Sequence, residues 1–164
     1  MAQFTREIIY DTKERAVVKF TVDPHSLTNG TYIAGQMTGS IPASSLLGYG
    51  IGVTSEGTQI NLSKCIWSIP TGGASTESTV YGVSWGLSGS LTGSPFLYLS
   101  DNGAVDFSSM GFTIKNTLTG NYTNTIFLYN TNTLDVQYAS YPSGAATIIL
   151  EIDKIKGFGL TQAT

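Results

Sequence analysis

The residue types that most often carry out catalysis are scarce in this chain. It contains one histidine, His25, and one cysteine, Cys65. A hydrolase triad needs a base beside a nucleophile and a third group that orients the base, and no nucleophile motif accompanies His25. Zinc sites take most of their ligands from His and Cys, which one residue of each type cannot supply. We therefore expect no triad and no metal centre, and we interpret Cys65 as a buried, unreactive thiol.

The carboxylates beyond the first 25 residues show no catalytic spacing. Those that could form the acid pair of a glycoside hydrolase are scattered over predicted turns and strands: Asp101, Asp106, Asp135, Glu151 and Asp153. The Asp-Asn-Gly at 101–103 lacks the alternating ligands and closing glutamate of a calcium loop, and the glycines within 48–52 lack the lysine of a phosphate-binding loop. The sequence therefore indicates no catalytic residue and no cofactor, and we expect a structural or binding protein rather than an enzyme.

Aromatic side chains leave a sugar-binding alternative open. Alternation places Trp85 on one face with Tyr81 and Val83, and Trp67 lies in an apolar strand, so we expect both tryptophans in the core. Three tyrosines flank predicted loops, where they could face a glycan or a neighbouring subunit: Tyr129, Tyr138 and Tyr141. A lectin-like adhesion module is therefore the alternative from a different functional class.

Composition argues against two further classes of partner. Of the 164 residues, 12% are charged and 41% are hydrophobic, and the formal net charge is -3. A weakly acidic chain has no basic field to attract phosphates, so we expect no nucleic-acid partner. No apolar run approaches the ~20 residues of a membrane helix, and the N-terminus lacks the apolar core of a signal peptide. We therefore expect no membrane partner and a soluble protein, compatible with a reducing cytoplasm.

Residues that favour β-strands recur along the whole chain. Residues 3–10 and 15–22 are rich in β-formers around a polar stretch, which predicts a hairpin or arm over 1–22. Further strands are predicted at 59–69, 79–87, 95–100, 104–107, 112–116, 124–130 and 145–154, separated by turns rich in Gly, Pro and Asn. No window shows the apolar spacing of an amphipathic helix. We expect one all-β domain over 1–164, a jelly-roll-like antiparallel β-sandwich with almost no helix.

Two local features refine this outline. Residues 28–57 are rich in glycine and also carry apolar side chains, so we expect a long ordered loop, or an irregular strand pair, that packs against the rest of the domain. The Asp-Asn-Gly at 101–103 lies between two apolar strands and accepts the left-handed dihedrals of a tight turn. This predicts a hairpin there with a well-fixed register.

Charge is concentrated at the two ends of the chain. Eight of the nineteen charged residues lie within 1–25 and four within 151–156. We expect the first hairpin and the last strand to lie near each other on one rim. The neutral, hydroxyl-rich middle is then expected to be the surface that packs against neighbours, because interface cores are poor in charge.

Several segments resemble a known class of protein. They are Ile-Asn-Leu-Ser-Lys-Cys-Ile-Trp-Ser at 60–68, Tyr-Gly-Val-Ser-Trp at 81–85, Phe-Leu-Tyr-Leu at 96–99, Gly-Ala-Val-Asp-Phe at 103–107 and Thr-Ile-Ile-Leu-Glu-Ile at 147–152. The residue types and patterning of these segments resemble those of the small β-rich structural proteins of tailed phages of the marine cyanobacterial type. The resemblance implies a virion protein assembled in the host cytoplasm, a capsid decoration (cement) protein that binds the major capsid protein and its own copies as a homotrimer on the capsid surface.

Two segments are candidates for contacts with neighbouring subunits. A cement protein must bury apolar surface against several neighbours. We expect these contacts from the N-terminal arm, through Phe4 and Arg6, and from the loop around Leu46, Leu47 and Tyr49. A neck or tail component of the virion is the first alternative, and its lower copy number per particle would distinguish it.

Overall fold

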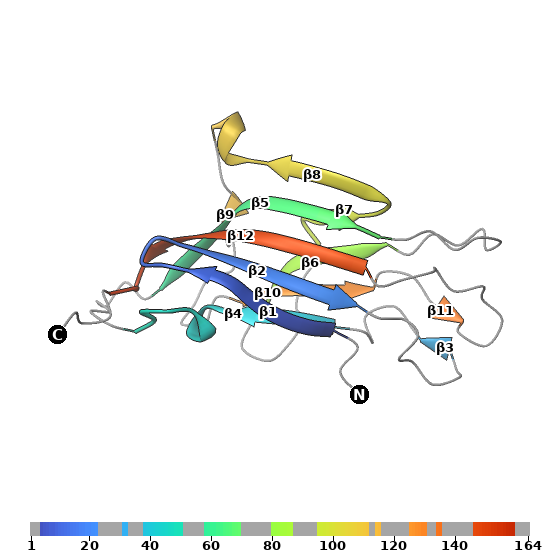
Figure 1. The fold of residues 1–164 in the computed structure, drawn as a ribbon, viewed down its shortest axis with the longest axis horizontal. Helices are drawn as coiled ribbons and strands as arrows, with labels where there is room; N and C mark the ends of the chain where they lie inside the picture. Colours follow the sequence, from blue (N-terminus) through green and yellow to red (C-terminus); the bar gives the residue numbers. More distant parts are fainter. Residues whose placement is uncertain are drawn as a thin grey trace.

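The computed structural model describes residues 4–22, 31–32, 38–50, 58–69, 80–86, 95–111, 114–115, 125–130, 134–135 and 146–159. Two antiparallel sheets dominate this part of the chain (Figure 1). His25, Tyr138 and Tyr141 lie outside it, as do most of the predicted turns. The prediction of an all-β sandwich is confirmed, and the jelly-roll connectivity stays a prediction.

The larger sheet has the strand order β1-β2-β12-β5-β8. Its strands are β1 (Phe4–Asp11), β2 (Arg15–Val22), β12 (Ala146–Lys156), β5 (Gln59–Ser68) and β8 (Asn102–Asp106), and β9 (Ile114–Lys115) also pairs with β5. The smaller sheet has the order β4-β10-β6-β7, formed by β4 (Thr38–Pro42), β10 (Thr125–Asn130), β6 (Tyr81–Gly86) and β7 (Leu97–Leu99). A two-stranded sheet joins β3 (Thr31–Tyr32) to β11 (Leu134–Asp135), and two short 3-10 turns complete the described part, η2 (Ala43–Ser45) and η3 (Ser108–Met110).

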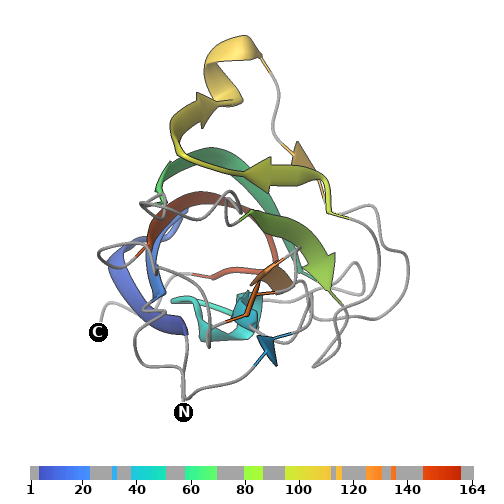
Figure 2. The ribbon, with the colours of Figure 1, turned by 90° about the vertical axis from the view of Figure 1, so that its right-hand side faces the viewer.

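Alternating side chains build the core between the two large sheets. Along β2, Val18 and Phe20 are fully buried whereas Lys19 and Thr21 are only partly covered, and β12 repeats the pattern. The buried apolar residues of both sheets form one cluster, around which the strands curve (Figure 2). Period-two alternation therefore fixes which face of each strand points inward.

The two charged ends of the chain lie side by side, as expected. β2 pairs with β1 on one side and with β12 on the other, so the N-terminal hairpin and the last strand share one sheet. Arg15 of β2 makes ion pairs with Glu151 and Asp153 of β12, each at 3.3 Å. The predicted hairpin is confirmed, and the turn of this hairpin and the end of β12 lie at the same end of the sheet (Figure 1).

Two local predictions are corrected by the pairing. The hairpin at 101–103 is wrong, because β7 pairs with β6 in the smaller sheet and β8 pairs with β5 in the larger one. The turn itself exists, with Asp101 at a φ of 55° and its carbonyl accepting the amide of Ile69 at 2.7 Å. The chain crosses between sheets there because β5 offers β8 an edge. Within 28–57, residues 31–32 and 38–42 are strands β3 and β4, which pair with β11 and β10 rather than with each other as an irregular strand pair.

The tryptophans lie differently in the core. Trp85 is 5% exposed, shares the buried side of β6 with Tyr81 and Val83, and stacks on Phe96, as expected. Trp67 is only half-buried at the margin of the core, where its indole nitrogen donates to the carbonyl of Ser100 at 2.9 Å.

Cys65 is fully buried in β5, and burial raises the pKa of its thiol to about 12. In the unfolded chain a thiol ionises above about pH 8.5. The native state therefore binds one more proton than the unfolded state above that pH, and stability that is fully present below it declines as pH rises toward 12. This predicts a loss of about 2 kcal/mol in the free energy of unfolding between about pH 8 and pH 10.

Urea denaturation across this pH range tests the prediction, with Cys65→Ala as the matched variant. The variant starts from a lower stability because it leaves a small cavity. Its free energy of unfolding is expected to fall by less over the same alkaline range than that of the unmodified chain. Parallel pH profiles for the two proteins would contradict the assignment to Cys65.

Candidate interaction surface at the hairpin end

A buried lysine joins three segments at the end of the sheet where β1 turns into β2. The Lys154 side chain has no exposed surface. Its ammonium donates to a carboxylate oxygen of Asp11, to the carbonyl of Thr12 at 2.5 Å and to the carbonyl of Leu47 at 2.8 Å. An ammonium has three N–H donors, so every donor has an acceptor. The hairpin turn, the segment after η2 and the last strand are thereby tied together.

A β-bulge in β1 brings Asp11 to this position. The pairing of β1 with β2 shifts between Ile8, opposite Val18, and Tyr10, opposite Val17. In a regular strand, residues 8 and 11 would point to opposite faces. The extra residue, Ile9, restores Asp11 to the inward face, opposite buried Ala16, because a bulge adds one residue to one strand only.

The segment after η2 is held at both ends. The amide of Leu47 donates to the second carboxylate oxygen of Asp11 at 2.8 Å. Tyr49 forms a β-bridge with Phe158, and the two rings meet edge to face at 6.1 Å. Gly48 has a φ of +82°, and a Cβ there would lie 2.3 Å from the carbonyl oxygen of Gly159. Only glycine therefore allows this close approach.

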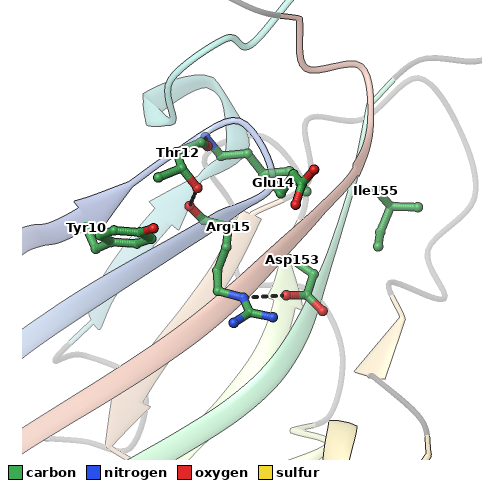
Figure 3. A pocket seen from close by; sticks show the side chains of 7 residues that line it. Tyr10, Thr12, Glu14, Arg15, Asp153 and Ile155 are labelled. Carbon is green, nitrogen blue, oxygen red and sulfur yellow. Dashed lines mark hydrogen bonds and ion pairs between the residues drawn. The ribbon is translucent and has the colours of Figure 1, made fainter.

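A pocket of about 500 Å³ opens beside this network. Its lining comes from the β1–β2 hairpin and from the end of β12: Tyr10, Thr12, Glu14, Arg15, Asp153, Lys154 and Ile155. Figure 3 shows Arg15 joined to Asp153 across the pocket, with Tyr10 on one side and Ile155 on the other. All three N–H donors of the Lys154 ammonium are used within the network. A ligand in the pocket would therefore form hydrogen bonds with the other polar residues that line it.

Two exposed apolar side chains, Tyr10 and Ile155, line the pocket. Ile9 precedes Tyr10 in β1, and the backbone carbonyl of Leu47 accepts from Lys154. Tyr10 and Ile9 are each 52% exposed, Ile155 is 50% exposed and Leu47 is 42% exposed. We call these four residues the hairpin-end patch. Scattered surface apolar residues are common, but several of them clustered beside a polar rim mark an interaction site. Three of these four residues come from the charged ends of the chain, whereas Leu47 comes from the neutral middle, as do the exposed Ile66, Tyr98 and Met110.

The structure gives the five predicted contact residues different surroundings. Phe4 packs edge to face on Tyr81 at 5.8 Å, and Arg6 donates to the carbonyl of Ser40 at 2.9 Å. Leu46 is buried, and Tyr49 is held by Phe158. Leu47 alone of the five is a large apolar side chain that stays exposed. The side chains of the other four make contacts within the chain, and the role of all five in subunit contacts stays a prediction.

Sequence reasoning missed the residues that complete this surface: Ile9, Tyr10, Lys154 and Ile155. A signal was present, because Ile8, Ile9 and Tyr10 are three consecutive apolar residues in a strand that should alternate. Such a run cannot bury every member on one face, so at least one apolar side chain must face solvent or a partner. Lys154 gave no such signal, because its burial depends on acceptors distant in the sequence.

The described residues offer no other recognisable site. Among them, no group of three or more His, Cys, Asp or Glu side chains could hold a metal ion. No helix in the part of the chain that the structure covers is long and apolar enough to cross a membrane. Tyr129, one of the three loop-flanking tyrosines, is 8% exposed.

No family model, curated protein or solved structure matches the chain.

Proposed function

We propose that this chain is a structural protein that docks to other protein subunits, as a capsid decoration protein on the surface of a virion. The observation that carries the proposal is the hairpin-end patch, a set of exposed apolar side chains on segments that the buried Lys154 network joins. A surface that is already ordered loses little conformational entropy when it binds. Such a surface suits permanent attachment to a lattice.

The chemistry of the patch matches that of a protein interface. Tyrosine is enriched among residues that dominate binding energy, and Tyr10 belongs to this patch, beside the ion pairs of Arg15. An apolar centre with a polar rim is the usual anatomy of an interface. The resemblance of the sequence to structural proteins of tailed phages supports a virion as the setting and the major capsid protein as one partner.

The alternatives differ in what supports them. A neck or tail component would use the same kind of surface, so its location on the particle is the distinguishing observation. A lectin-like module is supported less well, because Trp85 is buried and Trp67 donates its indole N–H inside the chain. Sugar-binding sites need aromatic faces that are open to the ligand.

Electron cryomicroscopy of virions that contain this chain tests the proposal. The expected result is density for the β-sandwich on the outside of the capsid, in many copies per particle. Density confined to the neck or tail would favour the first alternative, and absence of the chain from purified particles would overturn the proposal.

A binding assay adds a matched pair of variants. Recombinant Tyr10→Lys is expected to lower occupancy on stripped particles at least about tenfold, because a tyrosine anchor at an interface is worth more than about 1.4 kcal/mol. Tyr98→Lys is the control, since Tyr98 is 61% exposed on β7 of the other sheet. Truncation of β1 would be a poorer test, because it also removes the contacts of Phe4 and Asp11.

A further inference from the structure

We infer that the hairpin-end patch binds the same patch of a second copy of this chain, through a contact with two-fold symmetry that gives a dimer in place of the homotrimer that the resemblance implies. This inference rests on the proposed function, since it names a partner for the same surface. Three observations carry it: the balance of charge around the patch, two charges of opposite sign at its tip that no other described residue neutralises, and the pocket beside them.

Charge around the patch is balanced. The segments 11–15 and 151–156 contain four acidic and four basic residues, whereas the whole chain has a net charge of -3. Bringing two copies of a balanced surface together creates no net like-charge repulsion. A partner of strong opposite charge would gain little from such a surface, so complementarity favours a second copy.

The tip of the hairpin carries two charges that the described part of the chain leaves available. Arg15 is paired with Glu151 and Asp153, and Lys154 with Asp11. The side chains of Lys13 and Glu14 are exposed and make no hydrogen bond or ion pair with another described residue. They are adjacent in the turn, so a two-fold axis beside the turn would place Lys13 of each copy opposite Glu14 of the other.

The pocket gives the exchanged lysine a place to bind. Glu14 supplies a carboxylate to its lining and Tyr10 supplies an exposed ring, whereas the carboxylate of Asp153 is already paired with Arg15 (Figure 3). An ammonium is attracted both to carboxylates and to the face of an aromatic ring. In an isologous contact each copy both inserts a side chain and receives one, so two such exchanges form at once, while the apolar residues around the pocket pack against each other.

Charge reversal at the tip tests this arrangement by sedimentation of the purified chain. K13E places a carboxylate opposite Glu14 of the second copy, and E14K places an ammonium opposite Lys13 of the second copy. Each single variant is expected to weaken self-association about tenfold, because two attractive pairs become repulsive in both cases. The double variant K13E/E14K restores the association, and so does an equimolar mixture of the two single variants. Both positions are exposed in a turn, so folding is unaffected.

Tyr10→Lys is expected to weaken the association about thirtyfold, because the contact loses a tyrosine anchor that it would bury, while Tyr98→Lys leaves it unchanged. A wild-type chain that stays monomeric at ~100 μM would overturn the inference, since that excludes affinities in the range of weak specific contacts. Single reversals without effect, or a mixture that fails to associate, would overturn it as well. Particle occupancy is measured separately, so a monomeric chain that still decorates capsids would refute this inference and leave the proposed function standing.

Discussion

Replacing Lys154 with methionine is expected to lower the free energy of unfolding by about 3 kcal/mol. Methionine keeps most of the apolar stem but removes the ammonium, which leaves the Asp11 carboxylate and the carbonyls of Thr12 and Leu47 without their donor. Removing one member of a buried ion pair costs more than the pair contributed, because the remaining charge stays poorly solvated. Asp11 retains some contact with water, since its side chain is 18% exposed, so we expect the lower end of the usual range.

Urea denaturation measures this loss, and two further variants make it specific. Lys19→Met, on the outward face of β2, is expected to change stability by no more than about 0.5 kcal/mol. Asp11→Asn keeps an acceptor for the amide of Leu47 but removes the charge. The double variant Asp11→Asn/Lys154→Met is expected to lose less than the sum of the single variants, because the two residues interact directly. An equal loss for Lys154→Met and Lys19→Met would show that the network contributes no stability.

The same substitution has a local consequence for the patch. The Leu47 amide donates to Asp11 at 2.8 Å, and Lys154 holds both the carboxylate and the Leu47 carbonyl. Without the ammonium, the segment after η2 opens at lower cost, and hydrogen exchange at the Leu47 amide accelerates. If the hairpin-end patch needs this segment in place, Lys154→Met weakens docking as well as folding.

Truncating Phe20 to alanine is expected to cost about 4 kcal/mol of stability. Phe20 is among the largest fully buried side chains and lies in β2 between Arg6 of β1 and Ile148 of β12. Its removal opens a cavity between the sheets that the neighbouring strands cannot fill. Thermal or urea denaturation gives the measurement.

The next residue in β2 is the control for this prediction. Thr21 points to the opposite face of the sheet and is partly exposed, so Thr21→Val keeps the β-branched shape and should change stability by no more than about 0.5 kcal/mol. A reversed result, with Thr21→Val the more damaging, would mean that β2 is shifted by one residue and that its faces are exchanged.

The contrast between Phe20 and Thr21 shows which part of the fold could be predicted from the sequence. Alternation along β2 and β12 is a local property, so their positions and inward faces follow from the residues themselves. The hairpin at the N-terminus is equally local, because its two strands are joined by a few polar residues. The neighbouring position of the charged ends also followed, since a rim rich in charge must be solvated.

Strand partners were not predictable in the same way. Asp101 and its neighbours have the residues of a tight hairpin turn and do form a turn, yet β7 and β8 leave it for different sheets. The choice depends on the free edges of β5 and β6, which lie far from the turn in the sequence. The partner of β4 was unpredictable for the same reason, because residues 28–57 were expected as a loop or an irregular strand pair and only the edge of β10 decides where β4 pairs.

The candidate site was determined almost entirely by tertiary structure. The sequence by itself determined an all-β chain of low charge, with an apolar run at 8–10 that had to leave at least one side chain exposed. Only the fold placed Asp11, Leu47 and Lys154 within hydrogen-bonding distance, because they are separated by 36 and 107 residues and meet through the bulge in β1. A period-two pattern states which way a side chain points, whereas the partner it meets depends on which strands pair, and pairing is decided by contacts between distant parts of the chain.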